Sequence, residues 1–207
     1  MMLLTGAASA QWCGENGLIR FSLVEGDEIE SVRHAEPENG VIQLDVYAWL
    51  TDVVPVKRDG EAFLATGGFE FDLVIEGAQA FVLEKKVPIH HLDMGKTNES
   101  LIVGLDPGLT LIGGRTMLVQ WKVMFQGKPE DVVFRLREDP GLSCKTVDGC
   151  VECRSPGLYI GVEGSNQLTC FFGAGYVPAY LNPTGEPDFT PVTGSCGFED
   201  VGVFERR

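Results

Sequence analysis

Two carboxylates, Glu70 and Asp72, stand two residues apart in the alternating stretch 68–76. In an extended strand, side chains at this spacing point to the same side and lie about 7 Å apart. Inverting glycosidases use two carboxyl groups at a similar separation, one as acid and the other as base. The same spacing arises wherever acidic residues alternate along the solvent side of a strand. We therefore interpret Glu70 and Asp72 as part of a solvent-facing or partner-facing strand surface.

A nucleophilic hydrolase needs a serine or cysteine beside a base. The chain has three histidines, His34, His90 and His91, and no Gly-x-Ser-x-Gly motif. Ser195 lies among small residues, but its neighbour Cys196 is better explained as a disulfide partner. We therefore predict that the chain is not an enzyme. A secreted glycan-active hydrolase on a jelly-roll fold is the alternative.

The cysteines are better suited to disulfides than to metal binding. An even number of cysteines in an exported chain favours disulfides, and oxidising surroundings disfavour free thiolates. The first spacing after residue 140, Cys-x5-Cys, is not that of a usual zinc knuckle. We expect disulfides and leave their pairing open. The six candidates are Cys13, Cys144, Cys150, Cys153, Cys170 and Cys196.

Metal ligands other than cysteine are sparse. The His-His-x-Asp run at residues 90–93 sets two ligands next to each other, and adjacent residues of an extended chain point in opposite directions. We interpret this run as a loop. We expect no cofactor, with calcium at an acidic loop as the alternative, near Asp106 or around Glu186 and Asp188.

An aromatic pair, Tyr47 and Trp49, stands on the side of the predicted strand 41–50 that is opposite its apolar residues. Two exposed aromatic rings on one strand face form a platform for a polysaccharide or a protein. Packing under a loop or a neighbouring strand is the alternative. Tyr47 and Trp49, with Glu70 and Asp72, are the candidate binding residues.

The alternation of apolar and polar residues predicts an all-β chain. Short strands separated by Gly, Pro and Asn turns are typical of an antiparallel β-sandwich, jelly-roll or immunoglobulin-like. We expect no helix longer than two turns. The predicted strands span residues 18–24, 41–50, 68–76, 80–87, 101–105, 116–125, 132–136, 157–162 and 168–172.

Turn and tail signals complete this prediction. Asn39-Gly40 predicts a two-residue hairpin turn, and residues 106–108 (Asp-Pro-Gly) predict a turn that ends the strand before them. Four prolines between residues 176 and 194 argue against a central strand there. We expect a disulfide-stapled extension that lies on the sandwich, held by Tyr180, Phe189 and Cys196.

Composition bounds the function. The 207-residue chain is 44% hydrophobic, which allows a sizeable core, and its net charge of −14 repels phosphate backbones, so nucleic acid is excluded as a partner. No apolar run elsewhere is long enough for a membrane span. Residues 1–10 resemble the end of a signal peptide. We therefore expect a secreted or cell-surface protein with a domain over residues 11–140 and an extension over residues 141–207 packed on it.

The run from Val41 to Leu136 resembles a cohesin-type domain, a sandwich whose strand pattern carbohydrate-binding modules share. The matching pieces are residues 41–54, 68–73, 101–105, 114–125 and 132–136. The resemblance implies a jelly-roll sandwich that binds a calcium-loaded dockerin through one sheet face. Glu76-Gly77-Ala78 replaces the Asp, often followed by Pro, that the family carries after its hallmark strand, and the cysteine segment after residue 140 has no counterpart.

These observations predict a secreted, non-enzymatic recognition or scaffolding module that binds an extracellular protein or polysaccharide through a sheet face. A glycan-active hydrolase is one alternative. A surface-assembly or filament subunit, whose proline-rich tail pairs with a neighbouring copy, is the other.

Overall fold

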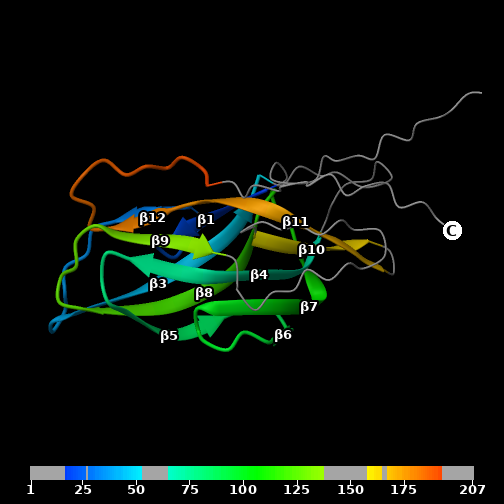
Figure 1. Cartoon of the computed structure of the whole chain (residues 1–207), viewed down its shortest axis with the longest axis horizontal. Helices are drawn as coiled ribbons and strands as arrows, with labels where there is room; N and C mark the ends of the chain where they lie inside the picture. Colours follow the sequence, from blue (N-terminus) through cyan, green and yellow to red (C-terminus); the bar gives the residue numbers. More distant parts are fainter. Residues whose placement is uncertain (1–16, 27, 53–64, 138–157, 165–166, 193–207) are drawn as a thin grey trace, which may run out of the picture.

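The computed structural model describes residues 17–26, 28–52, 65–137, 158–164 and 167–192, and contains twelve strands and no helix in these ranges (Figure 1). The first six strands are β1 (Leu18–Ser22), β2 (Val32–Arg33), β3 (Val41–Thr51), β4 (Ala65–Glu76), β5 (Ala80–Lys86) and β6 (His91–Asp93). The other six are β7 (Ser100–Thr110), β8 (Thr116–Gln126), β9 (Val132–Arg137), β10 (Leu158–Gly164), β11 (Gln167–Val177) and β12 (Ala179–Leu181).

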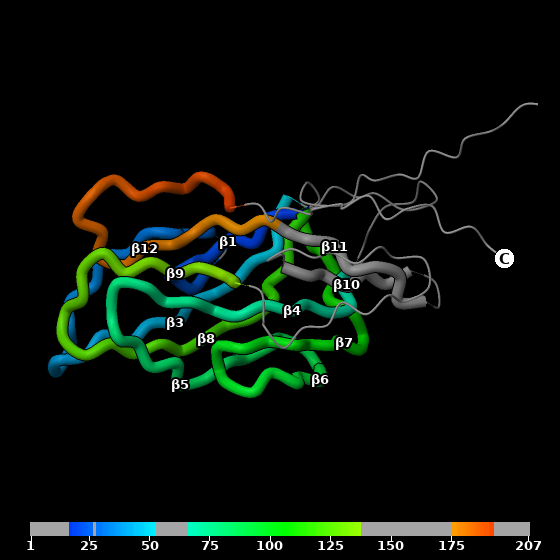
Figure 2. The backbone as a smooth tube through the Cα atoms, viewed as in Figure 1, coloured from blue at the N-terminus to red at the C-terminus, as the bar shows by residue number. Residues whose placement is uncertain are grey.

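The strands form the two layers of a β-sandwich, as the sequence predicts. One layer has the order β5-β8-β3-β1, and the other has the order β2-β12-β9-β4-β7-β6. Strands β10 and β11 join the layers, because β10 pairs with β4 and β11 pairs with β1. Figure 2 follows the chain through both layers. Most pairs are antiparallel, and β1–β11 and β2–β12 are parallel.

The core lies between the layers and is built by alternate residues of each strand. Phe69 and Phe71 of β4 are fully buried, as are Trp121 and Phe125 of β8. The rings of Phe71 and Trp121 meet across the layers with centroids 6.3 Å apart. The apolar residues that alternate through 19–23, 42–50 and 132–136, and that alternation predicts on one side of each strand, are buried as well. Alternation therefore identified the inner side of these strands correctly.

The predicted Asn39-Gly40 turn is confirmed. Both residues have positive φ, 52° and 80°, which suits an Asn-Gly pair. Backbone hydrogen bonds join Glu38 and Val41 across this turn in both directions.

The turn predicted at residues 106–108 is wrong. Strand β7 continues through Asp106, Pro107 and Gly108 to Thr110. The register on β4 shifts there, since Gly68 pairs with Gly104 whereas Thr66 pairs with Leu109. The extra residues of β7 form an irregular bulge, which accommodates a proline that a regular ladder excludes.

The predicted inner side of residues 116–125 is wrong at one end. Strict alternation with Val119, Trp121, Val123 and Phe125 predicts Met117 on the inner side, but Leu118 is fully buried and Met117 is partly exposed. The register with β3 shifts at this point, because Ala48 pairs with Val119 whereas Trp49 pairs with Met117. A bulge reverses the alternation, and period-two reasoning cannot locate it.

Two segments for which the sequence predicts no strand each contain one. Residues 91–93 form β6, and β12 lies between β9 and β2 although it follows Pro178. The proline precedes the strand and therefore removes no donor from it. The tail does return to the sheet, because Tyr180 and Phe189 pack edge to face with centroids 5.7 Å apart.

Several expectations fall outside the described residues. The signal-peptide segment 1–10 and the cysteines at 13, 144, 150, 153 and 196 belong to this group, and Cys170 lies in β11 at a position whose side chain is not described. In the ranges that are described, no helix is long and apolar enough to cross a membrane.

We predict that Phe71→Ala lowers the free energy of unfolding by about 3–5 kcal/mol, because it leaves a cavity against Trp121. Phe81→Ala is the matched control, since this ring is 39% exposed, and it should cost less than about 1 kcal/mol. Urea unfolding of both variants measures the difference. Equal losses would contradict the assignment of Phe71 to the core.

Candidate functional site

The four candidate binding residues do not form one site. Tyr47 and Trp49 alternate with the inner residues of β3, so they stand on the outer side of the β5-β8-β3-β1 layer. Glu70 and Asp72 stand on the outer side of β4 in the other layer. The core separates these two sides. We name the first the β8 face and the second the β4 face.

Tyr47 is not an exposed platform, because only 6% of the residue is accessible. Its hydroxyl accepts a long hydrogen bond, 3.5 Å, from Gln120 Nε2 on β8. Burial raises the pKa of the phenol, and the negative charges of Asp45 and Glu25 raise it further. Tyr47 therefore supports the sheet and offers no ring face to a ligand.

Trp49 is partly exposed and lies under a cation. The guanidinium carbon of Arg115 stands 5.2 Å from the centroid of the indole, within the range of a cation–π contact. Arg20 lies opposite Trp49 on β1 and forms an ion pair with Asp52 at 3.2 Å. One end of the β8 face therefore combines an indole with two guanidinium groups.

The other end of the β8 face is apolar. Phe81 and Leu83 of β5 are 39% and 46% exposed, and Phe81 pairs with the partly exposed Met124 of β8. Between the two ends, Lys122 lies opposite Asp45 and stands 3.9 Å from Glu84. The cations and anions of this face therefore neutralise one another, although the chain carries a net charge of −14.

Asp72 corrects the expectation of a solvent-facing acid. The residue is 6% exposed, and its Oδ2 accepts a hydrogen bond at 3.1 Å from Nη2 of Arg137 on β9. Asp72 lies directly opposite Arg137 in the register, so the pair bridges β4 and β9. Glu70 is partly exposed and is also engaged in interactions. Asp72 therefore links two paired strands, which alternation alone did not reveal.

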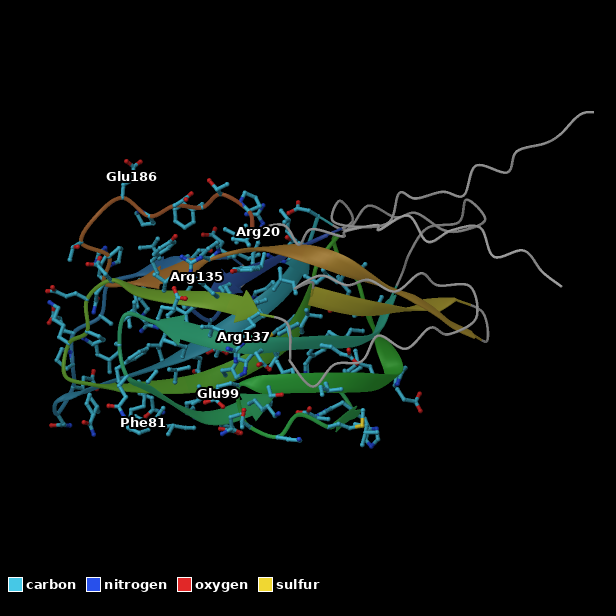
Figure 3. The ribbon with its side chains drawn as sticks, in the orientation of Figure 1. Arg20, Phe81, Glu99, Arg135, Arg137 and Glu186 are labelled. Carbon is cyan, nitrogen blue, oxygen red and sulfur yellow. The ribbon has the colours of Figure 1, made fainter. Side chains whose placement is uncertain are left out.

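The β4 face is further occupied by ion pairs and by the tail. Arg135 of β9 bonds Glu76 at 2.9 Å, and Figure 3 labels Arg135 and Arg137 along this strand. The hydroxyl of Tyr180 donates to the carbonyl of Asp188 at 2.6 Å, and Val192 exchanges two backbone hydrogen bonds with Tyr176. Residues 183–192 thus fold back on their own sheet.

Two carboxylates, those of Asp131 and Asp188, have displaced pKa values, and both belong to turns. Hydrogen bonds from Thr184 lower the pKa of Asp131, and hydrogen bonds from Thr190 lower that of Asp188. Both groups are exposed. These shifts reflect local hydrogen bonding and point to no paired acid and base.

The described residues hold no group of three or more His, Cys, Asp or Glu side chains that suits a metal ion. Glu186 and Asp188 lie on the tail, where the carboxylate of Asp188 accepts from the Thr190 amide at 2.8 Å. Asp106 is exposed on the bulge of β7.

The sequence did not single out Phe81, Leu83 or Arg115 as functional residues. The apolar residues of 80–87 predict a strand, but they do not show which of its side chains face the core and which face solvent. The bulge between Val82 and Glu84 on β5 explains why, since it breaks the period there. The position of β5 at the end of its layer is a property of the topology alone.

No protein-family model matches the sequence, and no curated protein matches it. The backbone is similar to that of cohesin modules. The seventh ScaB type I cohesin from Pseudobacteroides cellulosolvens is 9% identical, with a TM-score of 0.47 over 84% of this chain and 96% of that one. A cohesin module of a family 33 glycoside hydrolase from Clostridium perfringens ATCC13124 is 8% identical, with a TM-score of 0.46 over 82% and 98%.

A chain of the CaDoc0917–CaCohA2 complex at pH 5.5 is 12% identical, with a TM-score of 0.45 over 80% of this chain and 99% of that one. These likenesses describe the course of the backbone. Cohesins are also the family that residues 41–136 resemble in sequence.

We predict that Tyr47 makes stability pH-dependent at alkaline pH. Its pKa is raised above the ordinary 10.0, so the unfolded chain ionises first. The stability that this group contributes is intact below pH about 10 and is lost as the pH rises through the folded-state pKa. Urea unfolding should show the wild type losing stability relative to Tyr47→Phe above this pH. A constant difference between the two proteins would contradict the burial of Tyr47.

Proposed function

We propose that this protein is a recognition module that binds a protein partner through the β8 face. The observation that carries the proposal is the apolar, charge-neutral character of this face. Phe81 is exposed opposite Met124, and Leu83 is exposed further along β5. Between them and Trp49, the cation of Lys122 lies beside the anions of Asp45 and Glu84. Protein interfaces are depleted of net charge at the centre and enriched in aromatic residues, Met and Arg.

The β4 face is less suited to a partner. Its ion pairs, Asp72–Arg137 and Glu76–Arg135, already satisfy charged groups across strands. The tail covers a further part of it through Tyr180 and Tyr176. A partner on that side would have to displace contacts that the chain makes with itself.

A protein partner is favoured over a polysaccharide. Sugar rings stack on open aromatic faces, but Tyr47 is buried and Arg115 already lies over the ring of Trp49. Trp49 with an Arg beside it is instead the residue combination enriched at hot spots of protein interfaces. The resemblance of residues 41–136 to cohesins supports the same class of partner.

We further propose that the module is secreted or displayed at the cell surface and works without enzymatic activity. The small-residue pattern at the end of residues 1–10 supports export. The separation of the candidate carboxylates Glu70 and Asp72 from Tyr47 and Trp49, which lie in the other layer, supports a binding role.

The test compares two exposed phenylalanines. Phe81→Ser removes a ring that is 39% exposed on the β8 face, and Phe189→Ser removes one that is 44% exposed on the tail. Partners captured from the secretome of the source organism should bind Phe81→Ser at least about tenfold more weakly, as expected for a hot-spot side chain. Calorimetric titration of each purified partner measures the change.

Phe189→Ser should bind within about twofold of the wild type, because it lies outside the proposed interface. Trp49→Ala should weaken binding in the same direction as Phe81→Ser. Partner binding that survives both β8-face substitutions unchanged would refute the assignment of the site. Binding to a glycan array that depends on Trp49 would replace the protein partner by a polysaccharide.

A further inference from the structure

Strand β5 is the last strand of its layer and needs protection along its outer edge. It pairs with β8 on one side, and no strand in the described part of the chain pairs with the other. Its sequence, Ala-Phe-Val-Leu-Glu-Lys-Lys, begins with four apolar residues, and Phe81 and Leu83 are exposed. An exposed apolar edge strand is a template for pairing with another chain.

Asn98 occupies this edge from outside the layer. Its side-chain Nδ2 donates to the carbonyl oxygen of Val82 at 2.8 Å, so that acceptor is no longer open to a second strand. Its backbone carbonyl accepts from Nε1 of Trp121 at 3.0 Å. Trp121 is fully buried, so this backbone bond fixes Asn98 to the core while the side chain reaches β5.

Lys85 of β5 binds the segment that carries Asn98, between Asp93 and Ser100. Its Nζ donates to the carbonyl oxygens of Thr97 at 2.8 Å and Ser100 at 2.6 Å, and it stands 2.6 Å from Oδ2 of Asp93. Three acceptors match the three N–H groups of an ammonium. The side chains of Lys85 and Asp93 are only 16% and 12% exposed, so solvent screens this ion pair weakly.

The segment between Asp93 and Ser100 is folded tightly enough to maintain these bonds. Oδ1 of Asp93 accepts from the amide of Gly95 at 2.8 Å. A Cβ atom at Gly95 would collide with the backbone carbonyl of Ser100, so only glycine fits there. The bulge at Leu83 adds an irregularity that also discourages pairing.

We propose that residues 94–99, the edge loop, close the free edge of β5 and keep a second copy of the chain from pairing with it. Asn98 is the residue that blocks the strand, and Lys85 positions the loop that carries it. The edge loop acts within a single chain, so this proposal is independent of the partner proposed for the β8 face.

The hydrogen bond of Asn98 to Val82 also bears on the triplet Asn98-Glu99-Ser100. The triplet has the sequence of an N-glycosylation acceptor. In the folded chain, however, the nitrogen to which a glycan would be attached, Asn98 Nδ2, donates a hydrogen bond to the carbonyl oxygen of Val82. The triplet therefore supplies a matched control, because Ser100→Ala removes the glycosylation signal and keeps the Asn98 side chain.

The experiment uses Asn98→Ala and Asn98→Asp in the full chain. Both remove the donor to Val82 and keep the backbone bond to Trp121, and Asn98→Asp also keeps the shape of the side chain. We expect about tenfold faster amide exchange in residues 80–86 and 94–100, and a weight-average mass that rises with protein concentration in sedimentation velocity. Wild type and Ser100→Ala should remain monomeric with slow exchange.

A further substitution assigns the association to β5. Phe81→Lys in the Asn98→Ala background places a charge on the edge strand and should restore the monomer. Near-ultraviolet circular dichroism identifies variants that have kept their fold. Folded Asn98 variants that stay monomeric at millimolar concentration with unchanged exchange overturn the proposal, as does association that Phe81→Lys leaves intact.

Discussion

Trp121 imposes the constraint on which much of this structure depends. Among the described residues its side chain is the largest that is fully buried, and it lies between the layers. An indole carries one donor, and a buried donor without a partner costs about 1–3 kcal/mol. The carbonyl of Asn98 satisfies it at 3.0 Å. The need of one core residue for an acceptor thus fixes a surface segment, and through that segment the edge of β5.

The sequence was most informative where strands are regular. The core-facing residues of β1, β3 and β9, and those of β4 from Phe69 to Leu73, recur at every second position, because one side of each strand meets the core. It was least informative at bulges. The register shift near Leu118 and the continuation of β7 through Pro107 depend on which strand lies alongside. Local alternation of apolar and polar residues does not identify the pairing partner of a strand.

The candidate site shows the same division. Alternation placed Tyr47, Trp49, Glu70 and Asp72 on outer sides correctly, but an outer side is not always an exposed one. Asp72 is buried because Arg137 stands directly opposite in the register, and Tyr47 is buried although its side chain points away from the core. The order of strands also decides that Phe81 and Leu83 lie on the last strand of their layer. The burial of these outer side chains and the position of Phe81 and Leu83 both depend on which strands are neighbours, which the sequence does not state.

The two parallel pairs have a consequence for how the chain reaches its fold. Leu18 of β1 pairs with Gly175 of β11, and Val32 of β2 pairs with Tyr180 of β12. Each of these pairs joins residues that are far apart in sequence, 18 with 175 and 32 with 180, and contacts so distant form slowly. The antiparallel pair of β1 with β3 joins residues that lie much closer in sequence, Leu18 with Thr51. The two parallel pairs therefore close the sandwich late, after its sequence-near pairs have formed.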